Sequence, residues 1–216
     1  MRAYFLPAAI ACALTCCLTT TGRADIVFSN PIDRLNPAQD NPYTDDQVVI
    51  SGITVSGIGF GPGGIAGSNA TNEYRLTGWS NAFNSGNYIT WTLTPDSGNK
   101  LSLENLMYNS TVNANGPTMF ALRSSLDGFT ADIGAATGTG TTISLADAAF
   151  QNLMSSIEFR LFAWGANDGA GANSRQFGID DFVFNGVVAV PEASSFLFGG
   201  LGCAFLGLAW NRRRKA

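Results

Sequence analysis

The sequence predicts an all-β protein, a two-sheet antiparallel β-sandwich or jelly roll over residues 25–189. Three observations support this prediction. Apolar and polar residues alternate with a period of two in several short segments. Clusters of Gly, Asn, Asp and Ser separate these segments. No internal repeat of fixed period is visible, which argues against a solenoid or a propeller.

The clearest strands are expected at 88–93 and 157–163. In the first, Ile89, Trp91 and Leu93 would share one face while threonines occupy the other. The second segment alternates in the same way over a longer stretch. Further strands are expected at 48–55, 74–79, 101–103, 118–123, 141–145 and 182–186.

Turn-forming residues fill the gaps between these strands, at 61–64, 95–99, 113–117 and 165–174. One helical turn is expected within 146–153, capped by Ser144 or Asp147. The glycine-rich stretch 57–64 resembles a phosphate loop only superficially, because no Lys-Ser or Lys-Thr follows it. We therefore expect a flexible loop there.

The composition excludes several kinds of chemistry. The 216 residues contain no His and four Cys, and no Cys lies between residues 25 and 189. This segment therefore has no Ser-His-Asp or Cys-His nucleophile, no disulfide framework and no thiolate zinc site. A glycosidase with paired carboxylates needs neither residue type, but no spacing of the Glu and Asp residues marks such a pair. We expect no enzymatic activity.

The charge of the chain is unevenly distributed. Residues 25–189 hold 15 acidic and 6 basic side chains, a formal charge of −9, against −4 for the whole chain. A segment this acidic lacks a basic surface for nucleic acid or anionic lipid. Cations and neutral glycans are the compatible partners, although solubility alone would also explain the charge.

Residues 1–24 have the pattern of a secretory signal peptide. A positive charge at Arg2 is followed by a charge-free, mostly apolar run, and small residues stand at −3 and −1 of a cleavage site after Ala24. Two alternatives remain open. One is an uncleaved anchor, and the other is lipoprotein modification at Cys16 or Cys17, whose preceding residues lack the usual small-residue motif.

The tail, 190–216, combines a short motif, an uncharged stretch and a basic end. The uncharged stretch 193–210 has 18 residues, which as a helix would span ~27 Å, enough for a bilayer core. The basic residues that follow favour a cytoplasmic C-terminus. They are Arg212, Arg213, Arg214 and Lys215.

This order resembles the PEP-CTERM sorting signal of Gram-negative bacteria that make exopolysaccharide. Pro191 and Glu192 match the first two positions of its Pro-Glu-Pro motif, and Ala193 occupies the third. The resemblance covers about 27 of the 216 residues. It implies recognition by an exosortase-type membrane protease or transpeptidase that cuts near Pro191 and Glu192. The protein would pass through an inner-membrane intermediate to the cell surface or the extracellular matrix.

Two short stretches of the central segment resemble extracellular jelly-roll modules of carbohydrate-binding and adhesion proteins. They are Ser-Leu-Asp-Gly-Phe at 125–129 and Ile-Asp-Asp-Phe at 179–182. This resemblance implies the fold rather than an activity.

Two groups of residues are candidate binding sites. Asp180 and Asp181, with Asp168 from the loop before them, could supply the oxygen ligands that Ca²⁺ prefers, or they could cap loop amides. Trp79 and Trp164 border polar segments and could stack on sugar rings, or they could lie in the core.

These observations lead to one expected function and two alternatives. We expect an exported, non-enzymatic surface or exopolysaccharide-matrix protein with a structural or adhesive role. The first alternative is a carbohydrate-binding module with a defined sugar site. The second is a secreted hydrolase that uses carboxylates.

Overall fold

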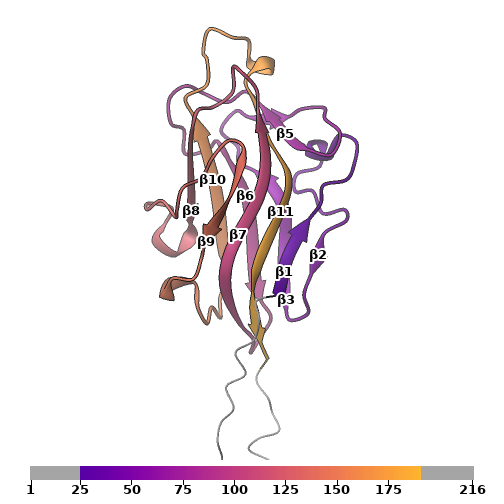
Figure 1. Ribbon diagram of the computed structural model, residues 1–216, viewed down its shortest axis with the longest axis vertical. Coiled ribbons are helices and arrows are strands. Elements are labelled where there is room, and N and C mark those ends of the chain that lie inside the picture. The colour runs from indigo at the N-terminus through magenta and orange to yellow at the C-terminus, as the bar shows by residue number, and fades with distance from the viewer. Residues whose placement is uncertain (1–24, 191–216) are drawn as a thin grey trace, which may run out of the picture.

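Two antiparallel sheets packed face to face make up residues 25–190, the part of the chain that the computed structural model describes (Figure 1). The predicted β-sandwich is confirmed. The signal peptide with its cleavage site at Ala24, the motif at 191–193, the span at 193–210 and the basic end at 212–215 lie outside the described residues. Between residues 25 and 190, no helix is long and apolar enough to cross a bilayer.

The larger sheet has seven strands and is organised around β11 (Gln176–Ala189). The strand β7 (Lys100–Val112) pairs with β11 along almost its whole length. On the opposite edge of β11, β5 and β1 pair with successive parts of the strand. The remaining bounds are β1 Asp25–Asn30, β2 Val48–Val49, β4 Ala66–Gly67, β5 Tyr74–Thr77 and β9 Gly140–Ser144.

The smaller sheet has four strands in the order β3-β6-β10-β8. Their bounds are β3 Ile53–Phe60, β6 Tyr88–Pro95, β8 Met119–Ser124 and β10 Ile157–Trp164. Four short 3₁₀ helices lie in the connections, namely η1 Pro37–Gln39, η2 Ser125–Asp127, η3 Ala148–Phe150 and η4 Ala172–Ser174.

Most predicted strands are present, with different bounds. The alternation expected in β6 and β10 is confirmed by their alternating burial. The predicted helical turn is η3, and the Asp147 side chain caps it by accepting a hydrogen bond from the backbone N–H of Ala149. The flexible loop expected at 57–64 is wrong for residues 57–60, which belong to β3. The strand expected at 48–55 is interrupted at Gly52, whose φ of 93° separates β2 from β3.

Aromatic side chains from both sheets fill the space between them. Trp91 of the smaller sheet is fully buried against Phe182 of the larger sheet, with ring centroids 5.5 Å apart. Phe159 and Phe184 meet in the same way at 5.4 Å. Such rings bury a large apolar area each, so the sandwich is held together by its core without a disulfide.

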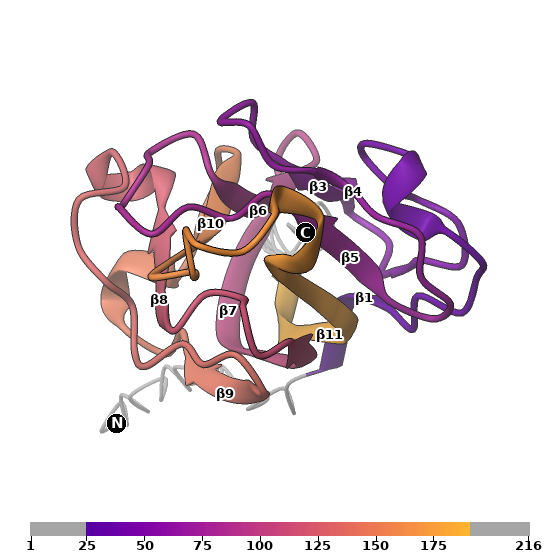
Figure 2. The same cartoon turned by 90° about the horizontal axis from the view of Figure 1, so that it is seen from above.

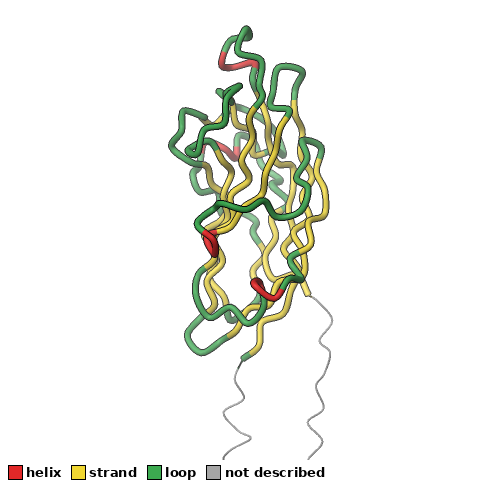
Figure 3. The backbone as a smooth tube through the Cα atoms, turned by 90° about the vertical axis from the view of Figure 1, so that its left-hand side faces the viewer, coloured by secondary structure: helices red, strands yellow, loops and turns green. Residues whose placement is uncertain are grey.

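The two ends of the described chain lie at the same end of the sandwich. Asp25 pairs with Gly186, and Ala189 pairs with Lys100, where β7 begins. Figures 1 and 3 show both chain ends leaving there. The opposite end, which we call the distal end, carries three loops that face the viewer in Figure 2. These distal loops are 78–87, 113–118 and 165–175.

Backbone hydrogen bonds tie the distal loops together. The N–H of Gly165 donates to the carbonyl of Asn81 at 2.8 Å, and the N–H of Asn167 donates to Asn115 at 3.1 Å. Loops joined in this way form one ordered cap over the ends of the strands. Side chains at this end are therefore held in defined positions.

We predict that Gly57→Ala destabilises the protein far more than Gly128→Ala. Both glycines have positive φ, 85° and 73°. A Cβ at Gly57 would lie 2.4 Å from the carbonyl oxygen of Tyr43, whereas a Cβ at Gly128 would meet nothing within 4 Å. We expect losses of about 3 kcal/mol or more and about 1 kcal/mol, respectively, in the free energy of unfolding. Urea denaturation measures both, and equal losses would contradict the close backbone approach at Gly57.

Candidate functional site

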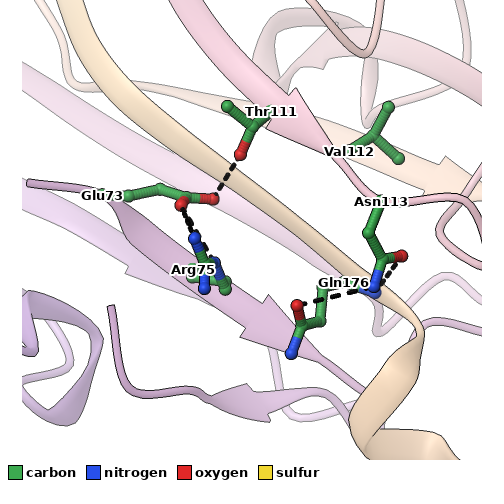
Figure 4. A pocket seen from close by; sticks show the side chains of 6 residues that line it. All are labelled: Glu73, Arg75, Thr111, Val112, Asn113 and Gln176. Carbon is green, nitrogen blue, oxygen red and sulfur yellow. Dashed lines mark hydrogen bonds and ion pairs between the residues drawn. The ribbon is translucent and has the colours of Figure 1, made fainter. Parts of the chain in front are cut away.

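Two pockets lie towards the distal end, one on the larger sheet and one beside the smaller sheet. The polar pocket is lined by Glu73, Arg75, Thr111, Val112, Asn113 and Gln176 (Figure 4). The Trp164 pocket is lined by Thr118, Met119, Phe120, Asp132, Ala136, Thr137, Gly138 and Trp164. The two pockets have different chemistry.

The polar pocket is built around the buried carboxylate of Glu73. One Glu73 oxygen accepts hydrogen bonds from Nε of Arg75 at 2.9 Å and from its Nη2. The other oxygen accepts from Oγ1 of Thr111 at 2.6 Å, as the dashed lines in Figure 4 show. Gly178 leaves room for this carboxylate, because a Cβ there would lie 2.3 Å from Oε1 of Glu73. These partners compensate the loss of water around a buried charge.

This arrangement suits a structural role better than acid-base catalysis. The hydrogen bond to Glu73 raises the pKa of Arg75 above its ordinary value, so the guanidinium stays charged. Both Glu73 oxygens are occupied, and the pocket measures about 170 Å³, below the usual size of a ligand pocket. The network joins Thr111 of β7 to Glu73 and to Arg75 of β5 across the intervening strand β11.

A β-bulge places Asp180 and Asp181 on the same face of the larger sheet. Ile179 pairs with Ser110 and Asp181 with Asn109, so Asp180 is the additional residue. Since Ile179 and Phe182 are both buried, the two aspartates between them share the outer face. In a regular strand they would point to opposite faces.

The two aspartates have different surroundings. Both carboxylate oxygens of Asp181 accept hydrogen bonds from Nδ2 of Asn109, at 3.0 and 2.9 Å. Partial burial raises the pKa of Asp180, and the negative charges of Glu73 and Asp181 add to this effect while Arg75 opposes it. Ionisation of Asp180 therefore costs more free energy in the folded protein than in the unfolded chain.

The three aspartates proposed as calcium ligands do not form one group. Asp168 lies in a distal loop, where it accepts hydrogen bonds from Nη1 of Arg175 at 2.9 Å and from the N–H of Asn81 at 3.2 Å. Asp180 and Asp181 are within β11 rather than at its start, so they do not cap a loop either. Among residues 25–190, no three His, Cys, Asp or Glu side chains gather in a way that could hold a metal ion.

The prediction that Trp79 offers a surface to sugars is wrong. Its side chain is fully buried, and its indole N–H donates to the carbonyl of Leu76 at 3.2 Å. Phe177 packs edge-on against it, with centroids 5.7 Å apart. Trp79 is a core residue, as the alternative interpretation expected.

Trp164, in contrast, is partly exposed on the outer face of the smaller sheet. Phe83 packs perpendicular to it, with centroids 5.4 Å apart, and Met119 is its cross-strand partner on β8. The Trp164 pocket beside it measures about 420 Å³, within the usual range for small ligands. Among residues 25–190, Trp79 and Trp91 are fully buried, so Trp164 is the tryptophan that a ligand can reach.

Two arginines continue the aromatic surface along the same sheet. The guanidinium of Arg123 lies 5.3 Å from the ring of Phe83, and that of Arg160 lies 4.2 Å from the ring of Tyr88. Each arginine is also paired with a carboxylate, Asp132 or Glu158. The cation-π contacts hold the rings in place, and the ion pairs neutralise the charges of the two arginines.

Sequence reasoning missed most of this site. Phe83 lies in a loop, where no periodicity distinguishes an exposed ring from a buried one. Asp132 reaches Arg123 from a segment without regular secondary structure. The one available signal was Trp164 itself, at the end of an alternating strand and next to a glycine-rich loop.

We predict opposite outcomes for two tryptophan substitutions. Trp79→Ala leaves a large core cavity and should cost about 3–5 kcal/mol of the free energy of unfolding. Trp164→Ala removes a partly exposed ring and should cost roughly 1 kcal/mol or less. Chemical denaturation with circular dichroism detection measures both values. A severe loss of stability for Trp164→Ala would place that ring in the core instead.

We also predict that Asp180→Asn stabilises the protein at neutral pH. Because the folded-state pKa of Asp180 is raised, its contribution to stability is present at low pH and is lost as the pH rises through that value. The variant should therefore unfold at higher urea concentration than the wild type near pH 7, and the difference should shrink towards about pH 3. Asp181→Asn is the control and should show no gain, because it weakens the bonds from Asn109.

We compared the chain with known protein families, curated proteins and solved structures. No family model, no curated protein and no solved structure matches this chain.

Proposed function

We propose that this chain is an exported, non-enzymatic surface or matrix protein with a structural or adhesive role. In this proposal, residues 1–24 direct export, 25–189 are the displayed module and 190–216 are a PEP-CTERM-like sorting tail. The order of motif, apolar stretch and basic end in the tail is the observation that carries the proposal. An exosortase-type enzyme is the expected processing partner.

The geometry of the sandwich supports display on a surface. The last residue before the tail, Val190, and the first residue after the proposed cleavage site, Asp25, lie at the same end of the module (Figure 1). Attachment through the tail would leave the distal end directed away from the attachment point. The distal end also carries the exposed apolar side chains of Phe83 and Met119 and the partly exposed ring of Trp164.

The lack of His and of a central Cys, together with the pairing of the buried carboxylate, supports a non-enzymatic role. The whole chain lacks His, and its central segment lacks Cys. Glu73, the buried carboxylate among the described residues, is neutralised by Arg75 and accepts a hydrogen bond from Thr111. No unoccupied acid-base pair is left in the polar pocket.

The sorting tail leads to a direct prediction about processing. In a host that makes an exosortase, the exported protein should lose the residues that follow the region of Pro191 and Glu192. In the same host without the exosortase, it should keep them and remain in the inner membrane. Intact-mass spectrometry of the C-terminus and membrane fractionation measure the two properties.

A double substitution provides the matched control. Pro191→Ala with Glu192→Ala should block processing in the exosortase-positive host, while Pro117→Ala with Glu104→Ala, which changes the same residue types in the module, should be processed normally. An unchanged C-terminal mass with inner-membrane residence in both hosts would refute the sorting proposal.

A further inference from the structure

We propose that the Trp164 pocket binds a neutral pyranose residue of a glycan. This inference rests on the proposed function only for the source of the glycan, which would be a polysaccharide of the cell surface or matrix. The aromatic wall of the pocket, its hydrogen-bonding groups, its charge and its place in the fold support this proposal.

The aromatic wall is the indole of Trp164, held on several sides. Phe83 packs against it at an interplanar angle of 89° but does not line the pocket. The backbone is fixed as well, because the carbonyl of Trp164 accepts a hydrogen bond from the N–H of Thr118 at 3.0 Å. A rigid, partly exposed indole can receive the C–H face of a sugar ring at little entropic cost.

The hydroxyl and carboxylate side chains of the pocket, those of Thr118, Thr137 and Asp132, offer acceptors to a ligand. The hydroxyl of Thr118 donates to the carbonyl of Gly165 at 3.2 Å, and that of Thr137 donates to the carbonyl of Gly140 at 2.8 Å. Both oxygens can still accept. Asp132 accepts from Nε of Arg123 through one oxygen at 2.7 Å, which leaves lone pairs on the carboxylate.

Such a lining selects a ligand that donates hydrogen bonds. Sugar hydroxyls can donate to these acceptors while the ring stacks on the indole. A uronate, sulfate or phosphate group would find no free cation here, because Arg123 is already paired with Asp132, and the segment as a whole has a formal charge of −9. The chemistry therefore favours a neutral sugar over an acidic one.

The hydroxyl of Tyr108 fixes one rim of this pocket. It donates to the carbonyl of Thr137 at 2.9 Å and accepts from the N–H of Thr137 at 2.9 Å. The Thr137 hydroxyl is thus presented by an ordered backbone rather than by a free loop. A ligand entering the pocket meets acceptors whose positions are already set.

The free edge of β8 is a poorer binding site for an extended peptide than the Trp164 pocket is for a sugar. The strand ends the four-stranded sheet, but the N–H of Ile133 already donates to the carbonyl of Leu122 on its free side, at 2.8 Å. A peptide added as a further strand would have to displace this segment. A sugar beside Trp164 requires no such displacement.

Titration of the purified full-length protein with neutral gluco-, galacto- and manno-oligosaccharides, followed by calorimetry, tests the proposal. At least one series should bind saturably, and Trp164→Ala should weaken that binding by roughly ten-fold or more. Asp132→Asn should weaken it less, because one oxygen acceptor remains. Met154→Ala, an exposed apolar residue outside the pocket lining, is the matched control and should leave the affinity unchanged.

Three outcomes would overturn the proposal. They are no binding of any neutral series up to about 10 mM, binding that Trp164→Ala leaves intact, and stronger binding of polygalacturonate than of every neutral sugar. If Trp164→Ala does not fold, the loss of sugar affinity is measured with Trp164→Phe and Asp132→Asn instead. Normal tail processing without sugar binding would refute the pocket alone, and sugar binding without processing would refute only the sorting proposal.

Discussion

The antiparallel ladder between β7 and β11 is the interaction on which the rest of this sandwich depends. Twelve residue pairs join the two strands, from Phe177 with Val112 to Ala189 with Lys100. The strands β1 and β5 pair with the other edge of β11, and β9 pairs with β7. The same ladder supplies Phe182 and Phe184 to the core and the two aspartates to the outer face.

Alternation predicted the fold class and the best strands because each of these segments has one buried face. It failed where burial does not follow the pattern. β7 continues to Val112, although a bulge at Glu104 shifts the phase of the alternation and the apolar Met107 is exposed. β3 continues through glycines that are typical of a loop, because it pairs with β6 there and the backbone of Tyr43 bonds to Ile58 on the other edge.

The candidate sites were less predictable because they depend on contacts between distant segments. The sequence identified Asp180 and Asp181 as neighbours but could not show that a bulge turns both to one face. It could not separate Trp79 from Trp164, since both border polar stretches. Only the packing of Phe177 on the first and the exposure of the second distinguish them.

The position of β11 has a mechanical consequence. A pull on the residues after Val190, opposed by a load at the distal loops, acts along the axis of this strand. In that geometry the hydrogen bonds to β7 and to its other neighbours are loaded in shear and resist together, rather than opening one after another as in peeling. The long register that organises the sheet therefore also resists force applied along β11.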